Sequence, residues 1–434
     1  MLKLLRFSEA YSNLARYMIL HLNNLEEFKA KAQSWASNFK VYCVLDSNSY
    51  PDPYTKFDFA IAADPADFVE TNSFLEISAF NLKHQNSWIF GGFGYDLKND
   101  IEPLSSNNTD YIEFPDAFFF VPKHILILKD KELEIISENA DEIWTAINSV
   151  VVQKPVKAKK LAIQQRFSKK DYINTVKQII HQISIGNIYE TNFCMEFYAS
   201  DAIIDPLNTY RQLNSQSPTP FSNYFKWFDR HIIAATPERF LAKRGEKLIS
   251  QPIKGTAKRG LTDEEDDKII AQLKESSKEQ QENVMIVDLV RNDLTKSAQE
   301  GSVRVEKLFG VHTFKQVHHL ISTIICIKKT ELDSVQVIRN TFPMGSMTGA
   351  PKIKAMELME QFEHTKRGMY SGAVGYFSPN GDFDFNVIIR TILYNETNKY
   401  LSFQVGSAIT YYAIPSLEYE ECLLKVKAIL AILT

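Results

Sequence analysis

A glutamate and a lysine flank a predicted β-hairpin in the segment 236–256. Two runs of strand-forming residues surround a turn near Gly245, and Glu238 and Lys254 lie equally far from it. They would therefore face each other at the open end of the hairpin. A carboxyl group and an amine held together could serve as a general acid and a nucleophile. Spacing alone still favours a surface ion pair.

Glutamates recur at helical spacing in two later segments. Glu279 and Glu282 lie three residues apart in one predicted helix, and Glu418 and Glu421 lie three apart in another. Each pair therefore shares one helix face. Such carboxylates could bind a hard cation, and Mg²⁺ often uses only one or two of them. Most acidic helix faces are merely solvated, so neither segment alone establishes a metal site.

A glycine-containing run at 345–352 precedes another predicted helix. Free amide groups at Thr348, Gly349 and Ala350 could hold a carboxylate at the start of that helix. The run lacks the spacing of a phosphate-binding P-loop, and the histidines form no metal or triad motif. Loops of this glycine content are more often simple turns.

The apolar residues Ile173, Val176, Ile180 and Ile183 predict a helix capped by Ser168. An alternating strand is predicted to follow it. Long βαβ repetition is missing, and this favours a mixed α+β fold with antiparallel sheets over a doubly wound parallel one.

The predicted strand covers 188–199, and its alternation separates two faces. Aromatic and apolar residues such as Phe193 lie on one face. Glu190 and Asn192 then point to the other, so these two polar side chains should share surroundings.

Composition excludes several classes of function. The chain has 434 residues and a formal net charge of -4, which argues against nucleic acid as the main partner. Its four cysteines are far apart, as expected in a reducing cytoplasm. We see neither a secretory signal nor an apolar run of membrane-spanning length. A basic stretch at 153–160 predicts a boundary between an N-terminal region, 1–150, and a catalytic region, 166–434.

Together and in this order, the motifs resemble those of the chorismate-utilising enzymes, which include anthranilate, aminodeoxychorismate, isochorismate and salicylate synthases. The resemblance is strong over 166–430 and implies a two-lobed antiparallel β-sandwich core with helices outside. The N-terminal part fits more loosely, and Ser47 matches a segment that contacts tryptophan in some members. The most specific stretches are Glu282–Leu294, Phe342–Lys352, Tyr370–Tyr376 and Glu418–Glu421.

The residue at position 254 separates branches of this family. Aminodeoxychorismate synthases commonly carry lysine there, as this chain does, whereas anthranilate synthases carry alanine. The resemblance implies that Glu238 protonates the leaving hydroxyl at ring carbon 4 of chorismate while Lys254 attacks carbon 2. Ammonia would then displace the lysine. Lys254 must be deprotonated for this step, and Lys258, Arg259 and a metal ion are expected to lower its pKa.

The resemblance also assigns a Mg²⁺ ion and the substrate contacts. Glu282 and Glu421 match the metal ligands, with Glu279 and Glu418 nearby, and the ion would hold the ring carboxylate. The matching substrate contacts are Tyr370 and Arg390 at the enolpyruvyl carboxylate, Lys425 and His319 near the ring, and the backbone of Gly406.

Glu190 departs from the family pattern. Many amidating relatives have glutamine at this position, and isochorismate synthases have a basic lysine. A carboxylate there could help to deprotonate incoming ammonium. The stretches Gly406–Ala408 and Ala413–Ile414 also differ from the usual residues, which leaves details of the carboxylate site open.

Several alternatives remain open. Anthranilate synthase would have alanine at position 254, and isochorismate synthase would have lysine at position 190. An inactive chorismate- or tryptophan-binding regulatory subunit is a rival of another class, although it would be free to lose Glu238, Lys254 and Glu282. No cysteine lies in a glutaminase-type nucleophile elbow. The resemblance therefore implies ammonia from solution or from glutamine through a separate glutaminase subunit.

Overall fold

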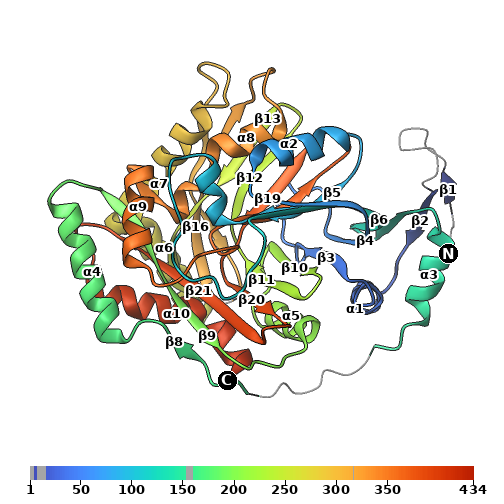
Figure 1. Ribbon diagram of the computed structural model, residues 1–434, viewed down its shortest axis with the longest axis horizontal. Helices are drawn as coiled ribbons and strands as arrows, with labels where there is room; N and C mark the ends of the chain where they lie inside the picture. The colour runs from blue at the N-terminus through green and yellow to red at the C-terminus, as the bar shows by residue number, and fades with distance from the viewer. Residues whose placement is uncertain (1–3, 7–15, 153–159, 316) are drawn as a thin grey trace.

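The computed structural model describes residues 4–6, 16–152, 160–315 and 317–434 (Figure 1). Within these residues the strands form one hydrogen-bonded network that folds into two sheets. The sheets share the long strands β4 (Phe59–Thr71) and β6 (Ala117–Lys129), whose two halves have different neighbours. A register shift between Pro65 and Asp67 interrupts the β4–β6 ladder, as a β-bulge does where strands bend.

The first sheet is antiparallel and does not follow chain order. It begins at the N-terminal strands and passes through β6 and β4 to β9. The outer edge of β9 pairs with short strands. Its remaining strands are β1 (Leu4–Arg6), β2 (Arg16–His21), β7 (Glu132–Ser137), β3 (Val41–Asp46), β10 (Phe221–Trp227), β11 (Arg230–Thr236), β20 (Thr391–Asn395), β21 (Tyr400–Ile409), β9 (Glu190–Ala199), β8 (Gln164–Gln165) and β17 (Gly349–Ala350).

The second sheet extends from the other half of β6 and is also antiparallel. Its last strands gather around β16, which pairs with β13 and β14 along one edge and with β15 along the other. Its strands are β5 (Ile89–Phe93), β18 (Ala373–Phe377), β19 (Phe383–Val387), β12 (Arg239–Arg244), β13 (Lys247–Gln251), β16 (Val317–Ile327), β14 (Ile253–Lys258) and β15 (Arg304–Thr313).

Aromatic side chains fill the space between the two sheets. Phe118 of β6 makes an edge-to-face contact with Phe225 and lies 4.9 Å from Trp227, measured between ring centroids. Both partners belong to β10 of the first sheet, and Phe385 of the second sheet joins the same core. The interdigitated faces make a β-sandwich. The predicted α+β fold with a two-lobed antiparallel sandwich is confirmed.

Helices cover the outer faces of both sheets (Figure 1). Those on the first sheet are α1 (Leu25–Ala36), α3 (Ala140–Ser149), α4 (Lys169–Ser184), α5 (Pro206–Gln216), α9 (Lys352–Phe362) and α10 (Pro415–Leu433). Those on the second are α2 (Phe74–Lys83), α6 (Asp263–Glu275), α7 (Ser277–Thr295) and α8 (Ser334–Thr341). Two short 3₁₀ turns, η1 (Tyr95–Asp100) and η2 (Gly345–Met347), complete the set described.

The predicted helix after Ser168 is confirmed as α4, and the Ser168 side chain accepts a hydrogen bond from the amide of Asp171. Its buried face is rotated from the predicted stripe, because Tyr172 and Ile179 are buried with Val176 whereas Ile173 and Ile180 are only partly covered. The alternating strand is confirmed as β9.

The two predicted regions contribute neighbouring strands to both sheets. β3 pairs with β10 in the first sheet, and β5 pairs with β18 in the second. The predicted boundary falls on 153–160, and residues 153–159 lie outside the described part of the chain. The division into 1–150 and 166–434 therefore stays a prediction.

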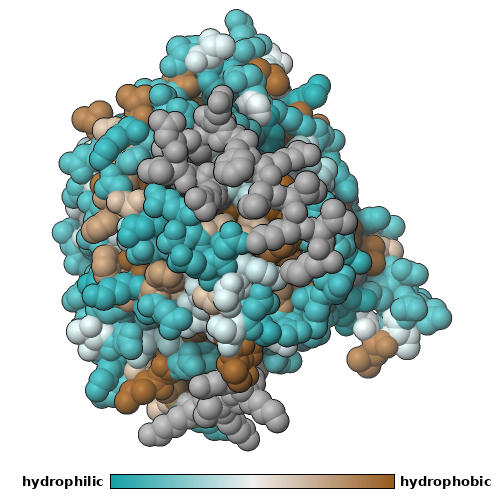
Figure 2. All heavy atoms as spheres, turned by 90° about the vertical axis from the view of Figure 1, so that its right-hand side faces the viewer, coloured by the Kyte–Doolittle hydropathy of each residue, from teal (hydrophilic) through white to brown (hydrophobic). Residues whose placement is uncertain are grey.

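Among the described residues, no helix combines the length and apolar character needed to cross a membrane. The face seen in Figure 2 is mostly hydrophilic, with hydrophobic residues in separate small groups.

Candidate active site

A cavity of about 1040 Å³ lies where β14, β21, α7 and α10 meet. Among the described residues it is far larger than the next cavities. Its wall carries both cations and carboxylates, as expected for a polar, charged ligand. The charged or ionisable residues that line it are Glu238, Lys254, Lys258, Arg259, Lys278, Glu279, Glu282, His319, Tyr370, Arg390, Glu418, Glu420, Glu421, Lys425 and Lys427.

Glu238 enters this cavity from the connection between β11 and β12. Its side chain is buried, and the Ser346 hydroxyl donates a hydrogen bond of 2.6 Å to Oε1. Burial raises the pKa of Glu238 to about 7, although Ser346 and the charge of Lys254 act in the opposite direction. A carboxyl with this pKa keeps a large protonated fraction at neutral pH, which suits a proton donor.

Lys254 lies on β14, and its side chain reaches the same cavity. Among the described residues no hydrogen bond or ion pair occupies its amine, whereas its carbonyl accepts from Asn283 at 3.3 Å. The next residue, Gly255, has a φ of +93°, and an added Cβ would lie 3.1 Å from the Glu279 carboxylate. Glycine therefore lets β14 bend beside the lysine without crowding that carboxylate.

The predicted hairpin is confirmed, but the direct pairing of Glu238 with Lys254 is wrong. Arg244 pairs with Lys247 at the turn, and the register then shifts between Arg239 and Ala242. Lys254 lies on a separate strand, β14, which pairs with β16. The two side chains consequently meet at the cavity and not across one ladder.

The two cations expected near Lys254, Lys258 and Arg259, line the same cavity. Arg259 also pairs with Asp266 at 2.8 Å. Their expected effect on Lys254 stays a prediction. Burial raises the pKa values of Glu238 and Glu279, and the charge of Lys254 opposes this rise.

The four predicted metal-site glutamates do line one wall, two from α7 and two from α10. Burial, together with the neighbouring acids, raises the pKa values of Glu279 and Glu418. The charge of Lys425, whose amine lies 2.6 Å from Glu421, lowers the pKa of that carboxyl. Within the described residues, no three histidine, cysteine, aspartate or glutamate side chains form a ready metal cluster.

The Lys278 ammonium lies near one carboxylate from each of the two helices. Lys278 Nζ lies 3.7 Å from Glu282 and 3.9 Å from Glu418. These carboxylates from different helices therefore approach one positive charge together. Oxygen donors of this kind suit a hard cation, so the residues fit Mg²⁺. Lys278 was missed by sequence analysis, and its spacing of four residues from Glu282 was the available signal.

Arg390 and Tyr370 lie in the same cavity wall. No hydrogen bond or ion pair with a described residue engages the Arg390 guanidinium, and its backbone has a φ of +52°. Such a conformation is uncommon outside glycine and often marks a functional position. Tyr370 is buried, and burial raises its pKa. An unpaired guanidinium beside a phenol can bind a carboxylate.

His319 also lines the cavity and is buried. Its Nδ1 atom lies 2.8 Å from the Thr256 hydroxyl, a contact that orients the ring. Burial lowers the pKa of His319 to about 3, so its imidazole is neutral at physiological pH. It can position a ligand by hydrogen bonding but does not add positive charge.

Lys425 and Gly406 contact each other beside the acidic wall. The Lys425 ammonium donates to the Gly406 carbonyl at 3.0 Å and forms the ion pair with Glu421. A Cβ at Gly406 would lie 2.5 Å from the amide group of Asn192. Glycine is therefore needed for β21 to pack against Asn192.

Thr348, Gly349 and Ala350 are not among the residues that line the cavity. Gly349 and Ala350 form β17 and pair with β9, while the Thr348 hydroxyl donates to backbone carbonyls of its own turn. The same run does contribute to the site through Ser346, the partner of Glu238. Ser346 lay inside the recognised motif, but its hydrogen bond could not be read from spacing.

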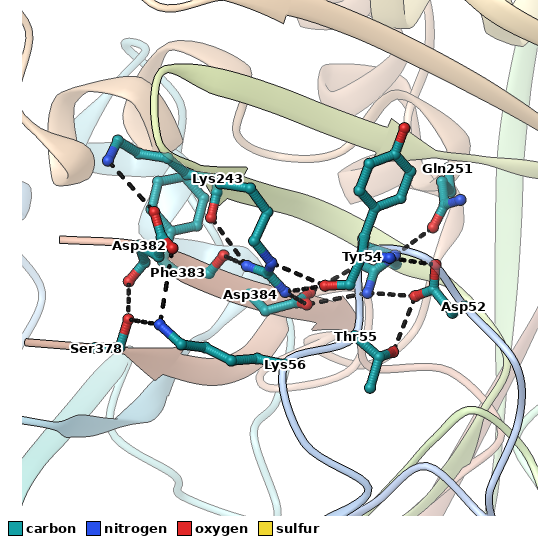
Figure 3. Close-up of polar contacts among 12 residues, drawn as sticks. Asp52, Tyr54, Thr55, Lys56, Lys243, Gln251, Ser378, Asp382, Phe383 and Asp384 are labelled. Atoms are coloured by element: carbon teal, nitrogen blue, oxygen red, sulfur yellow. Dashed lines mark hydrogen bonds and ion pairs between the residues drawn. The ribbon is translucent and has the colours of Figure 1, made fainter. Parts of the chain in front are cut away.

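Ser47 lies elsewhere, at a cavity of about 50 Å³ between β3 and the second sheet. Its hydroxyl is buried and has no hydrogen-bond partner among the described residues. Figure 3 shows the polar network beside this cavity, in which Asp52, Asp382 and Asp384 contact surrounding cations and hydroxyls. The expectation that tryptophan binds at Ser47 stays a prediction.

Sequence comparison places this site in a known family. Residues 29–431 match the family model described as chorismate binding enzyme. The chain is 40% identical over 387 residues to a probable chloroplastic aminodeoxychorismate synthase of Oryza sativa subsp. japonica, covering 78% of this chain and 43% of that protein. It is 34% identical over 381 residues to aminodeoxychorismate synthase component 1 of Klebsiella aerogenes, covering 85% and 83%.

Structural comparison agrees on the fold. Anthranilate synthase component I from Streptococcus pneumoniae superposes with a TM-score of 0.71 at 24% identity, covering 97% of this chain and 93% of that one. The chain spans less than half the length of its plant relatives. The family match nevertheless extends over nearly all of the sequence, and we conclude that this chain belongs to the family of chorismate binding enzymes.

Proposed function

We propose that this chain aminates chorismate at ring carbon 4 to give 4-amino-4-deoxychorismate, a precursor of 4-aminobenzoate and folate. The observation that carries the proposal is the amine of Lys254, unpaired among the described residues, in the same cavity as buried Glu238. A nucleophile and an acid with a pKa of about 7 are the two groups that the substitution needs. Relatives named aminodeoxychorismate synthase support the same reaction.

The chemistry divides into two displacements. Glu238 donates a proton to the hydroxyl at carbon 4, the carbon–oxygen bond breaks and water leaves, while Lys254 forms a bond to carbon 2 and both ring double bonds shift. Ammonia then forms a bond to carbon 4, both double bonds shift back, the bond from carbon 2 to Lys254 breaks, and the electron pair returns to the amine. Covalent catalysis replaces one difficult substitution by two easier ones.

The remaining residues hold the substrate in this proposal. Arg390 and Tyr370 bind the enolpyruvyl carboxylate, because the guanidinium is otherwise unpaired among described residues. His319, Lys425 and the backbone of Gly406 lie near the ring.

The acidic wall would hold a metal ion. Glu282 and Glu421, with Glu279 and Glu418 beside them, are its proposed ligands. When bound, Mg²⁺ would screen the charge of the ring carboxylate.

Ammonia is proposed to come from glutamine through a separate glutaminase subunit, with ammonium in solution as the simpler source. A bacterial relative of which the chain covers 83% is named component 1, and this name supports a second component that supplies ammonia.

The test is the product formed by purified protein with chorismate, MgCl₂ and ammonium chloride, resolved by mass spectrometry. We expect 4-amino-4-deoxychorismate, and we expect Lys254→Ala to abolish it. Anthranilate or isochorismate as the product would instead assign the chain to another branch and remove the nucleophilic role of Lys254. Binding of chorismate without turnover would favour a regulatory subunit.

A further inference from the structure

Glu190, the first residue of β9, is a buried acid without a partner. Its side chain is 2% exposed, and neither carboxylate oxygen has a hydrogen-bond partner among the described residues. Glu196, on the same strand, is also buried but accepts from Arg166, Tyr400 and Ser402. Buried polar groups are almost always paired, so an unpaired carboxylate points to a missing ligand.

Glu190 is not itself among the residues that line the large cavity, but it shares a strand face with one that does. Residues two apart on a strand share a face, and Asn192 lines the cavity. β17 pairs with the edge of β9 at Glu190, since a Cβ at Gly349 would lie 2.3 Å from the Glu190 carbonyl oxygen. Glycine thus permits a tight backbone contact between the two strands.

Two charged groups act on Glu190 from the elements that surround it. Lys254 on β14 lowers its pKa, and Glu282 on α7 raises it. Burial is the largest influence and also raises the pKa. Glu190 therefore shares the electrostatic surroundings of the nucleophile, yet it has no ion pair with it among the described residues.

We propose that Glu190 binds the incoming nitrogen as an ammonium ion and accepts its proton, so that ammonia forms beside Lys254. This inference rests on the amination proposed above. It specifies that the second substrate binds as ammonium and reacts as ammonia. Ammonium offers four donors in a small volume, which suits a buried carboxylate that can only accept.

The proton balance gives Glu190 and Glu238 opposite roles. In the first displacement Glu238 loses a proton to the departing water. In the second, ammonium gives a proton to the Glu190 carboxylate, ammonia bonds to carbon 4, and Lys254 leaves with its electron pair. The sum is chorismate plus ammonium giving protonated product plus water.

Each turnover thus ends with Glu190 protonated and Glu238 ionised. One proton must pass from Glu190 to Glu238, directly or through solvent, before the next cycle. The same lysine charge acts on both carboxyls, which places the two acids in the surroundings of one nucleophile.

The experiment compares Glu190→Gln with the wild-type protein. The second-order rate constant, kcat/KM, for total ammonium is measured from pH 7 to 8.5 at saturating chorismate and MgCl₂. Without its base the variant depends on free ammonia, so its kcat/KM relative to wild type should rise by about tenfold per pH unit. Titration of Glu238 affects both proteins and cancels in this ratio.

Glu196→Gln is the matched control, because it removes a buried carboxylate from the same face of β9 that is fully bonded elsewhere. Its ratio to wild type should not change with pH. Intact-protein mass spectrometry with chorismate alone should detect equal Lys254 adduct in wild type and Glu190→Gln, which verifies folding and the first step. A flat ratio for Glu190→Gln overturns the inference, whereas wild-type protein without adduct or product overturns the proposed function itself.

Discussion

Glu238 and Arg239 are adjacent in the chain but lie in two different polar environments. Glu238 faces the large cavity, whereas the Arg239 guanidinium is fully buried between Asp52 at 2.7 Å and Asp384 at 2.9 Å. This ionic network lies beside the small cavity at Ser47. The position of the proposed general acid therefore depends on charges contributed by a loop of the N-terminal region.

Asp52→Asn should weaken the ionic network that holds Arg239. It keeps the shape of the side chain but removes one charge opposite a buried guanidinium, and we expect a loss of about 3 kcal/mol in the free energy of unfolding. Displacement of Glu238 should lower kcat for amination more than it raises KM for chorismate. Urea unfolding and steady-state kinetics measure the two effects.

Asp64→Asn provides the control for this change. Asp64 pairs with Lys123 at 2.9 Å, but both side chains are substantially exposed. Loss of a surface pair should change stability by less than about 1 kcal/mol and leave kcat unchanged. If Asp52→Asn also kept its wild-type kcat, the Arg239 network would have no role in positioning Glu238.

Titration of Glu238 should make both kcat and the free energy of unfolding depend on pH. Because its pKa is raised to about 7, the proton donor is lost as pH rises through that value, and kcat should fall. The unfolded chain releases the same proton near pH ~4.3, so stability falls as pH rises from there to about 7. Glu238→Gln should lower kcat by roughly 10²–10⁴-fold and remove this part of the stability profile.

Rate profiles and urea unfolding at pH 5 and pH 8 test both statements. The exposed residue Glu132 supplies a control, since Glu132→Gln should leave the two profiles as in the wild type. A stability difference between Glu238→Gln and wild type that does not change with pH would show that Glu238 is not buried as a neutral acid.

The sequence predicted the helices and strands better than the contacts between them. The cap at Ser168 and the repeating acids on α7 depend on neighbours three or four residues away, and such local patterns are visible in a sequence. The hairpin at Gly245 was predicted for the same reason. Its register was not, because the shift between Arg239 and Ala242 reflects the pairing of β12 with two other strands.

The residues of the site divide in the same way: some were found from local sequence patterns, and others depend on contacts between segments distant in sequence. Glu238, Lys254 and the four glutamates were found through motifs and do line one cavity. The pairing of Lys278 with Glu418 joins two helices that are distant in sequence. Among the described residues the Glu190 carboxylate likewise has no partner because of its tertiary surroundings, which no spacing rule reveals.

His319 should remain neutral across the working pH range. Its pKa is lowered to about 3 by burial, so its ring nitrogens should show no titration between pH 5 and 8 in ¹⁵N NMR. The His319→Gln spectrum identifies the resonances. A ring that titrates in this range would contradict the neutral imidazole and allow His319 to act as an acid. Thr256→Val should lower kcat by about tenfold, since it removes the hydrogen bond that orients the ring.

Lys278 should compete with Mg²⁺ for the acidic wall. Its ammonium lies near Glu282 and Glu418 and must leave before a metal ion can bind both carboxylates. Lys278→Gln should therefore bind Mg²⁺ about three- to tenfold more tightly in isothermal titration calorimetry, the range expected for one or two ion pairs made by an exposed lysine. Lys274→Gln on α6 is an exposed control that should match wild type, and Glu282→Gln should lose binding. Weaker binding by Lys278→Gln would show that the lysine supports the site, whereas no heat from any of the proteins would contradict the metal site itself.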